Sequence, residues 1–201
     1  MRTNTIAAVS IITAIIVSSN YVLMGFPQIK LMDSMVFLTG YLFGVRAAVS
    51  VSILSWLVYG SINPLGTAGF PLIVVLMIGE MVYGIAGHLF RKYYNMQSKL
   101  KKNPIEMTIM LGCISVICTF VYDIWTNAIE GLIIFQNVDG IILRIITGIP
   151  FSIIHQLANI VIFCFLVPIF IYMLTNLKTE IDFEWKKCKV CCNYRNYFYY
   201  I

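Results

Sequence analysis

Long apolar stretches that carry almost no charge make up most of this chain. Of its 201 residues, 60% are hydrophobic and 11% are charged. A bilayer core about 30 Å thick is crossed by roughly 20 apolar residues in a helix. Unpaired backbone groups are costly in lipid, so a span is either a helix or part of a closed barrel. Barrel strands alternate polar and apolar residues, whereas these stretches are continuously apolar. The sequence therefore predicts an all-α integral membrane protein.

The apolar pattern predicts a bundle of six transmembrane helices in one domain, residues 1–178. The expected helices cover residues 5–25, 31–44, 46–61, 70–90, 105–128 and 145–175. The second and third are short and are joined by the turn Gly44-Val45-Arg46. The last apolar stretch would be about 50 Å long as a straight helix, and Pro150 offers a break. We therefore expect residues 131–150 to form an outer loop or an interfacial helix that folds over the bundle.

Basic residues are distributed unevenly along the chain. Most lie in one loop and in the tail: Arg91, Lys92, Lys99, Lys101, Lys102, Lys178, Lys186, Lys187, Lys189 and Arg195. With the N-terminus inside, the inner segments also hold Arg2 and Arg46, and the outer segments hold Lys30 and Arg144. Cytoplasmic segments of membrane proteins are enriched in Lys and Arg, so both termini are predicted to be cytoplasmic. The net charge of +5 is interpreted as a topology signal and an attraction to anionic lipid, not as a nucleic-acid site.

Polar groups inside a membrane bundle are costly, which makes them candidates for a functional site. At 1.5 Å per residue, Asp123 and Asn159 each lie about 28 Å from the inner end of their helix. Tyr59 and Asn63 lie about 20 and 25 Å beyond Arg46. Three helices are thus predicted to bring polar side chains to one level near the outer surface.

Helical spacing and aromatic character add further candidates at this level. Those that share a helix face with Asp123 or Asn159, or that offer an aromatic wall, are Asn127, Glu130, Ser152, His155, Trp56 and Trp125. For the residues at the outer helix ends, a plain interfacial position in contact with lipid headgroups stays open as an alternative.

Glu80 is expected near the middle of the membrane, about 16 Å from the inner face. An acid at that depth faces the bundle and either finds a partner or stays protonated. Tyr83, one turn further on, is a candidate partner. A helix-packing hydrogen bond and a substrate contact both remain open for Glu80.

Small residues form a stripe on the first helix. They recur every fourth position and are Ser10, Ala14 and Ser18, with Ala7 on the same side. Such a stripe lets another helix approach closely, either within the bundle or from a partner protein. The glycines of the fourth helix, Gly79, Gly84 and Gly87, predict packing within the bundle.

A basic tail rich in Cys and Tyr, residues 179–201, follows the membrane domain. Cys188, Cys191 and Cys192 lie in it without a second Cys pair or a His nearby. Zinc sites usually have four ligands, so no metal is expected; a half-site, lipidation and reduced thiols stay open. No His-Glu-x-x-His, Gly-x-Ser-x-Gly or phosphate-binding glycine motif occurs in the sequence. Neither a catalytic residue nor a cofactor is predicted.

Two segments resemble a known family. Residues 35–48 read Met-Val-Phe-Leu-Thr-Gly-Tyr-Leu-Phe-Gly-Val-Arg-Ala-Ala, and residues 123–127 read Asp-Ile-Trp-Thr-Asn. They are similar to the second-to-third helix hairpin and to the end of the fifth helix in the substrate-binding S component of energy-coupling factor (ECF) vitamin transporters. The chain length, six helices and small-residue stripe also resemble that family, over roughly residues 5–175.

The resemblance implies a non-enzymatic subunit that captures a vitamin-like small molecule at the outer face of the cell membrane. It implies that a transmembrane coupling subunit docks on the stripe, where serine partly replaces the family's alanine, and that two cytoplasmic ATPase subunits supply energy. The residues that match the family's ligand-binding location are Asn63, Asp123, Asn127, His155 and Asn159. Beside them, Tyr59 or Trp125 is expected to stack on a ring of the ligand.

Two other functions stay open. One is a membrane enzyme in which Glu80 or Asp123 acts with His155 in acid–base chemistry. The other is a scaffold or assembly factor that binds membrane proteins through its small-residue faces.

Overall fold

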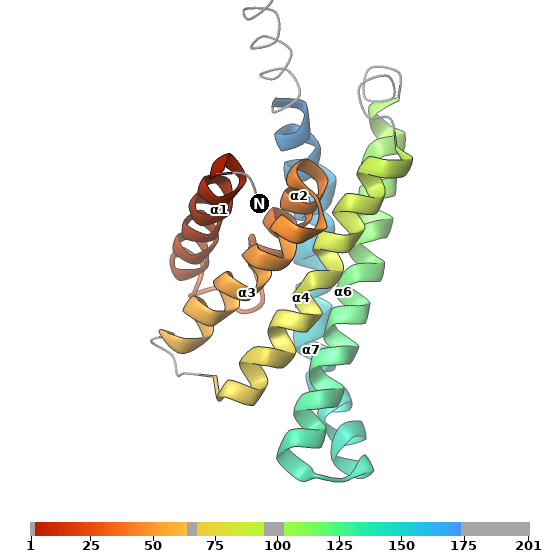
Figure 1. Ribbon diagram of the computed structural model, residues 1–201. Helices are drawn as coiled ribbons and strands as arrows, with labels where there is room; N and C mark the ends of the chain where they lie inside the picture. Colours follow the sequence, from red (N-terminus) through yellow and green to blue (C-terminus); the bar gives the residue numbers. More distant parts are fainter. Residues whose placement is uncertain (1–2, 64–67, 95–102, 174–201) are drawn as a thin grey trace, which may run out of the picture.

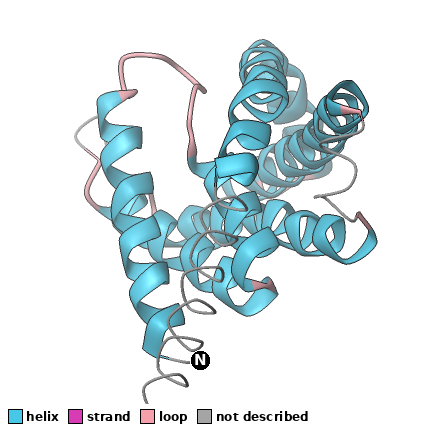
Figure 2. Ribbon diagram, turned by 90° about the horizontal axis from the view of Figure 1, so that it is seen from above, coloured by secondary structure: helices cyan, strands magenta, loops and turns pink. Residues whose placement is uncertain are grey.

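The computed structural model describes residues 3–63, 68–94 and 103–173, and all regular structure in this part of the chain is helical (Figures 1 and 2). The helices are α1 (Thr3–Val22), α2 (Met32–Phe43), α3 (Val45–Ser61), α4 (Phe70–Tyr93), α6 (Pro104–Phe135) and α7 (Val138–Val161). A π-helical turn, η1 (Ile162–Leu166), continues α7, and the helix runs on to residue 173. The predicted all-α class is confirmed. The cysteine tail lies outside the described residues.

Four of these helices are long and apolar enough to cross a membrane: α1, α4, α6 and the continuous helix Val138–Met173. The chain is thus a multi-pass membrane protein by the length and composition of its helices. The 12 residues of α2 rise only about 18 Å, which is less than the thickness of the hydrocarbon core. With the 17 residues of α3, α2 forms the short pair expected from the sequence.

The segment 131–150 differs from the prediction of a loop or interfacial helix. Helix α6 continues to Phe135, Gln136 adopts a left-handed conformation with φ 56°, and α7 begins at Val138. Pro150 lies inside α7 without ending it. Proline removes one backbone hydrogen bond, but membrane helices tolerate it where neighbouring helices support the backbone, and α7 packs along α6. The two helices form a hairpin that extends the bundle (Figure 1).

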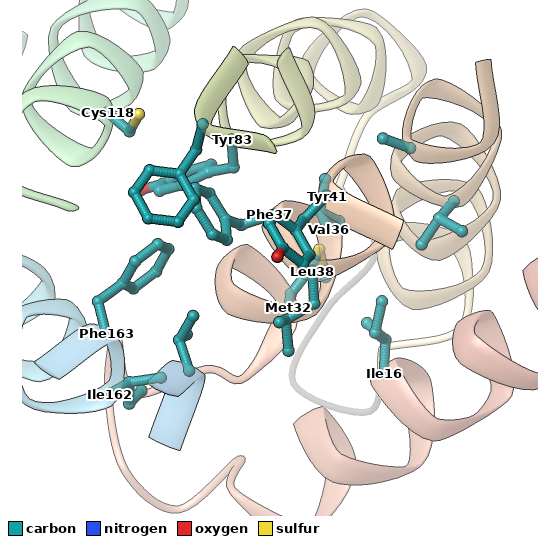
Figure 3. Packing of buried hydrophobic residues seen from close by; sticks show 14 of the residues in the cluster. Ile16, Met32, Val36, Phe37, Leu38, Tyr41, Tyr83, Cys118, Ile162 and Phe163 are labelled. Carbon is teal, nitrogen blue, oxygen red and sulfur yellow. The ribbon is translucent and has the colours of Figure 1, made fainter. Parts of the chain in front are cut away.

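Helix α2 lies at the centre of the bundle. Its buried residues include Met32, Val36 and Phe37 (Figure 3). The Phe37 ring meets the Phe163 ring at 5.2 Å between centroids, so α2 packs against the last helix as well as against α4. At the far end of α2, Arg91 donates hydrogen bonds to the Tyr41 and Leu42 carbonyl oxygens at 3.2 and 2.8 Å, which satisfies acceptors that a helix end leaves free.

Glycines set the close crossing of α2 and α4. A Cβ atom on Gly87 would lie 2.0 Å from the Phe37 carbonyl oxygen, and one on Gly40 would lie 2.0 Å from the Gly84 carbonyl oxygen. Side chains at these positions would collide with backbone, which cannot rotate away. The predicted packing role of the α4 glycines is confirmed.

The start of α1, the end of α4, the start of α6 and the end of the last helix lie toward one end of the bundle, the upper end in Figure 1. The end of α3, the start of α4 and the α6–α7 connection lie toward the other end. Arg91 and Lys92 are at the first end, because they close α4. Lys30 precedes α2, and Arg144 follows the α6–α7 connection.

Replacing Gly87 by alanine is expected to lower the stability of the bundle by about 1–3 kcal/mol or more, because overpacking forces α2 and α4 apart. Thermal unfolding of the purified protein in detergent measures this effect. Gly25→Ala is the matched control, since nothing lies within 4 Å of a Cβ built there. Equal melting temperatures for the two variants would contradict the close crossing.

Candidate functional site

A histidine bridges two carboxylates inside the bundle. The His155 Nε2 atom lies 2.7 Å from Asp33 Oδ2, and its Nδ1 atom lies 2.9 Å from Asp123 Oδ1. His155 is on α7, Asp33 on α2 and Asp123 on α6, so three helices meet at one imidazole ring. An imidazole protonated on both nitrogens donates to both carboxylates. The His155 and Asp33 side chains are only 4% and 3% exposed, and Asp123 is 14% exposed.

Asn159, one helical turn beyond His155 on α7, extends this cluster further into the interior of the bundle. Its Nδ2 atom is close to Asp33 Oδ2, and lies 3.0 Å from Thr119 Oγ1 and 3.2 Å from the Tyr83 hydroxyl. Tyr83 donates to Thr119 Oγ1 at 2.9 Å. Buried polar groups of this kind are stable only when they bond to one another. We call Asp33, Thr119, Tyr83, Asp123, His155 and Asn159 the buried polar network.

Asp33 was not among the residues predicted from the sequence, although a signal for it exists. It is an ionisable residue in the first turn of an apolar helix, and such residues within membrane segments usually face the bundle and have a partner. What the sequence could not show is that this turn of α2 lies opposite α7. The pairing spans 122 positions along the chain.

Between the network and the end of the bundle where α4 begins lies a cavity of about 490 Å³. Among the predicted substrate contacts, it is lined by Tyr59, Asn63, Asp123 and Asn127. Other polar walls come from Lys30, Glu130, Arg144 and Ser152, and apolar walls come from Leu72, Leu76 and Phe151. The cavity thus lies where α3 ends and α4 begins, at the end of the bundle opposite Arg91 and Lys92. Asp123 belongs to both the cavity wall and the network.

His155 and Asn159 lie deeper in the bundle than the cavity and are not among its lining residues. Each is nearly fully buried, with 3% and 1% exposure. The Tyr122 ring, which lines the cavity, stands edge-on to the His155 ring at 5.6 Å. Tyr122 and Asp123, which line the cavity, both contact His155, so they lie between it and the cavity.

Trp125 and Glu80 each make a hydrogen bond between two helices. Trp125 donates from Nε1 to the Val75 carbonyl oxygen of α4 at 3.0 Å and is not among the cavity-lining residues. Glu80 is fully buried and accepts from Trp56 Nε1 at 3.1 Å. The Tyr83 hydroxyl bonds to Thr119 and not to Glu80 as suggested from spacing. Of the two interpretations of Glu80, the structure shows the helix-packing hydrogen bond.

Asn127, Glu130 and Arg144 form the rim on the α6–α7 side. Arg144 donates from Nε and Nη2 to Glu130 Oε2 at 2.9 and 2.7 Å. Asn127 donates to the Asp123 backbone oxygen at 2.8 Å. Its Oδ1 atom faces α7 at Gly148, where a Cβ would lie only 2.5 Å away. Within the described residues, no cluster of three His, Cys, Asp or Glu groups is arranged to hold a metal ion.

Comparison of the chain with protein-family models, with curated proteins and with solved structures gave no significant match. Function is therefore inferred from the residues and their geometry.

Replacing Asp33 by asparagine is expected to destabilise the bundle by about 3–5 kcal/mol, because removing one member of a buried charged pair leaves the other without its partner. Thermal unfolding in detergent tests this against Asp139→Asn, which removes an exposed carboxylate from the first turn of α7. If both variants have the melting temperature of the wild type, the buried polar network does not stabilise the fold.

Proposed function

We propose that this chain is the substrate-binding subunit of an ECF-type importer. It captures a vitamin-like small molecule at the outer face of the cell membrane and releases it inside with ATP-driven partner subunits. The cavity carries this proposal: pockets for small molecules usually measure roughly 300–1,000 Å³ and combine apolar walls with a few placed polar groups. A cavity of about 490 Å³ with Tyr59, Asn127 and Phe151 in its walls has that size and that mixture.

The distribution of charge supports an outward-facing cavity. Arg91 and Lys92 lie at the opposite end of the bundle, and positive charge is enriched on cytoplasmic segments. The start of α1 and the end of the last described helix lie at that same end (Figure 1). Under this proposal α2 and α3 are counted as the second and third of six spans, and both termini are cytoplasmic.

The small-residue stripe supports docking on a coupling subunit. Helix α1 buries Val9 and Ile16 against the bundle, whereas Ser10, Ala14 and Ser18 are all exposed. The two serine hydroxyls donate to backbone oxygens of their own helix, at 3.1 and 2.7 Å. The stripe therefore has only small side chains, and its hydroxyls already have hydrogen-bond acceptors, which suits close helix packing in a membrane.

The ligand-binding part of the proposal predicts that the purified full chain carries a small molecule at one copy per chain, which native mass spectrometry of the detergent-solubilised protein detects. Asn127→Ala is expected to weaken its retention about tenfold through the lost amide contact. Asn4→Ala, on an exposed turn of α1, is the control. An empty wild-type protein that also shows no thermal shift with a vitamin panel would favour the scaffold or enzyme alternative.

The docking part predicts that Ala14→Leu prevents co-purification with the coupling and ATPase subunits, because a bulky side chain keeps the partner helix away from the stripe. Ala8→Leu adds the same atoms to a half-buried position of α1 outside the stripe and is expected to leave assembly intact. Ligand retention in both variants shows that the bundle is folded. Assembly of Ala14→Leu at the wild-type level would contradict docking on the stripe.

A further inference from the structure

Lys30 lines the cavity, and within the described residues it has no ion-pair partner. Its ammonium group lies 5.0 Å from the centre of the Trp56 ring and 5.9 Å from that of Tyr59, and all three residues contribute to the cavity wall. Among the described residues, the ion pairs join Arg144 to Glu130 and His155 to two aspartates. The charge of Lys30 is therefore held by aromatic faces and not by a direct carboxylate contact.

Each carboxylate near Lys30 already has a hydrogen-bond partner at one of its oxygens, although Glu80 Oε1 has none within the described residues. Asp123 and Asp33 bond to His155, and Glu80 accepts from Trp56. Burial lowers the pKa of the Lys30 ammonium from its ordinary value, against the opposing effect of these nearby carboxylates. A negative group bound at Lys30 would offset this desolvation.

The other residues that line this cavity limit the chemical character of the rest of a ligand. Leu72 and Leu76 of α4 and Phe151 of α7 add apolar side chains to the cavity lining. The second cationic group, Arg144, is already paired with Glu130. One unpaired ammonium matches one negative charge, as in a carboxylate, better than it matches a phosphate group with up to two charges and three acceptor oxygens.

We propose that the ligand carries a carboxylate that pairs with Lys30, with its apolar body against α4 and α7. This inference rests on the proposed function, because it names the class of molecule that the same cavity takes. The two basic residues predicted outside, Lys30 and Arg144, both border this cavity, and only Lys30 is left to meet an anion.

The test uses the full chain in detergent and begins with the small molecule that co-purifies with it. The wild type, Lys30→Met and Lys30→Arg are compared by native mass spectrometry. They are then compared by binding of three acid and neutral pairs: nicotinate and nicotinamide, biotin and biotinamide, pantothenate and panthenol. Lys92→Met is the matched control, because the Lys92 ammonium also lies over an aromatic ring, 5.3 Å from the centre of the Tyr93 ring. Lys92 is in the last turn of α4, at the end of that helix away from the cavity.

The expected ligand is a carboxylic acid that is retained by wild type, Lys30→Arg and Lys92→Met and lost by Lys30→Met. A panel acid that binds is expected to bind about 10- to 100-fold more tightly than its neutral partner, as for a charge-assisted hydrogen bond, and Lys30→Met is expected to remove that preference. A co-purified ligand without a carboxylate, a neutral panel member that binds as tightly as its acid, or full acid binding by Lys30→Met overturns the inference and leaves the proposed function standing. A wild-type protein that carries no ligand and binds no panel member overturns both.

Discussion

Two carboxylates from different helices share one histidine ring, and the arrangement of the bundle depends on that contact. A buried carboxylate without a partner is far too costly to keep in an apolar interior. Asp33 is located on the most deeply buried helix, so α2 can stay at the centre only if another helix supplies a donor. His155 supplies it from α7, and its second nitrogen reaches Asp123 on α6. The position of each of these helices is thereby linked to the other two.

The same contact connects the core with the cavity. Asp123 uses one carboxylate oxygen for His155 while its side chain also borders the cavity. Its orientation therefore depends on His155, which is not among the residues that line the cavity. Asn159, Tyr83 and Thr119 hold the inner end of this chain of hydrogen bonds. Under the proposed function, a wall held by these hydrogen bonds would lose little entropy on binding a ligand.

Much of the site could be anticipated from spacing along single helices. Helix rise placed Asp123, Tyr59 and Asn63 at a similar depth, and the structure places all three around one cavity. Spacing along a helix could not reveal that His155 turns toward Asp33, because that contact joins segments 122 residues apart. Nor could it reveal that Trp125 turns to the α4 backbone. A face of a helix is a property of its sequence, whereas the neighbour of that face is a property of the bundle.

The sequence by itself determined that this chain forms apolar helices of membrane length, because lipid leaves backbone groups no other partner. It also determined that the α4 glycines permit close packing and that the first helix has a face of small residues. Only the tertiary structure decided that Pro150 lies within a continuous helix, since packing along α6 supports the backbone that proline interrupts. Only the tertiary structure decided that the small face of α1 points away from the bundle. It also decided that Lys30 meets two aromatic rings and no carboxylate within ion-pair distance among the described residues, because these contacts form between segments that the sequence separates.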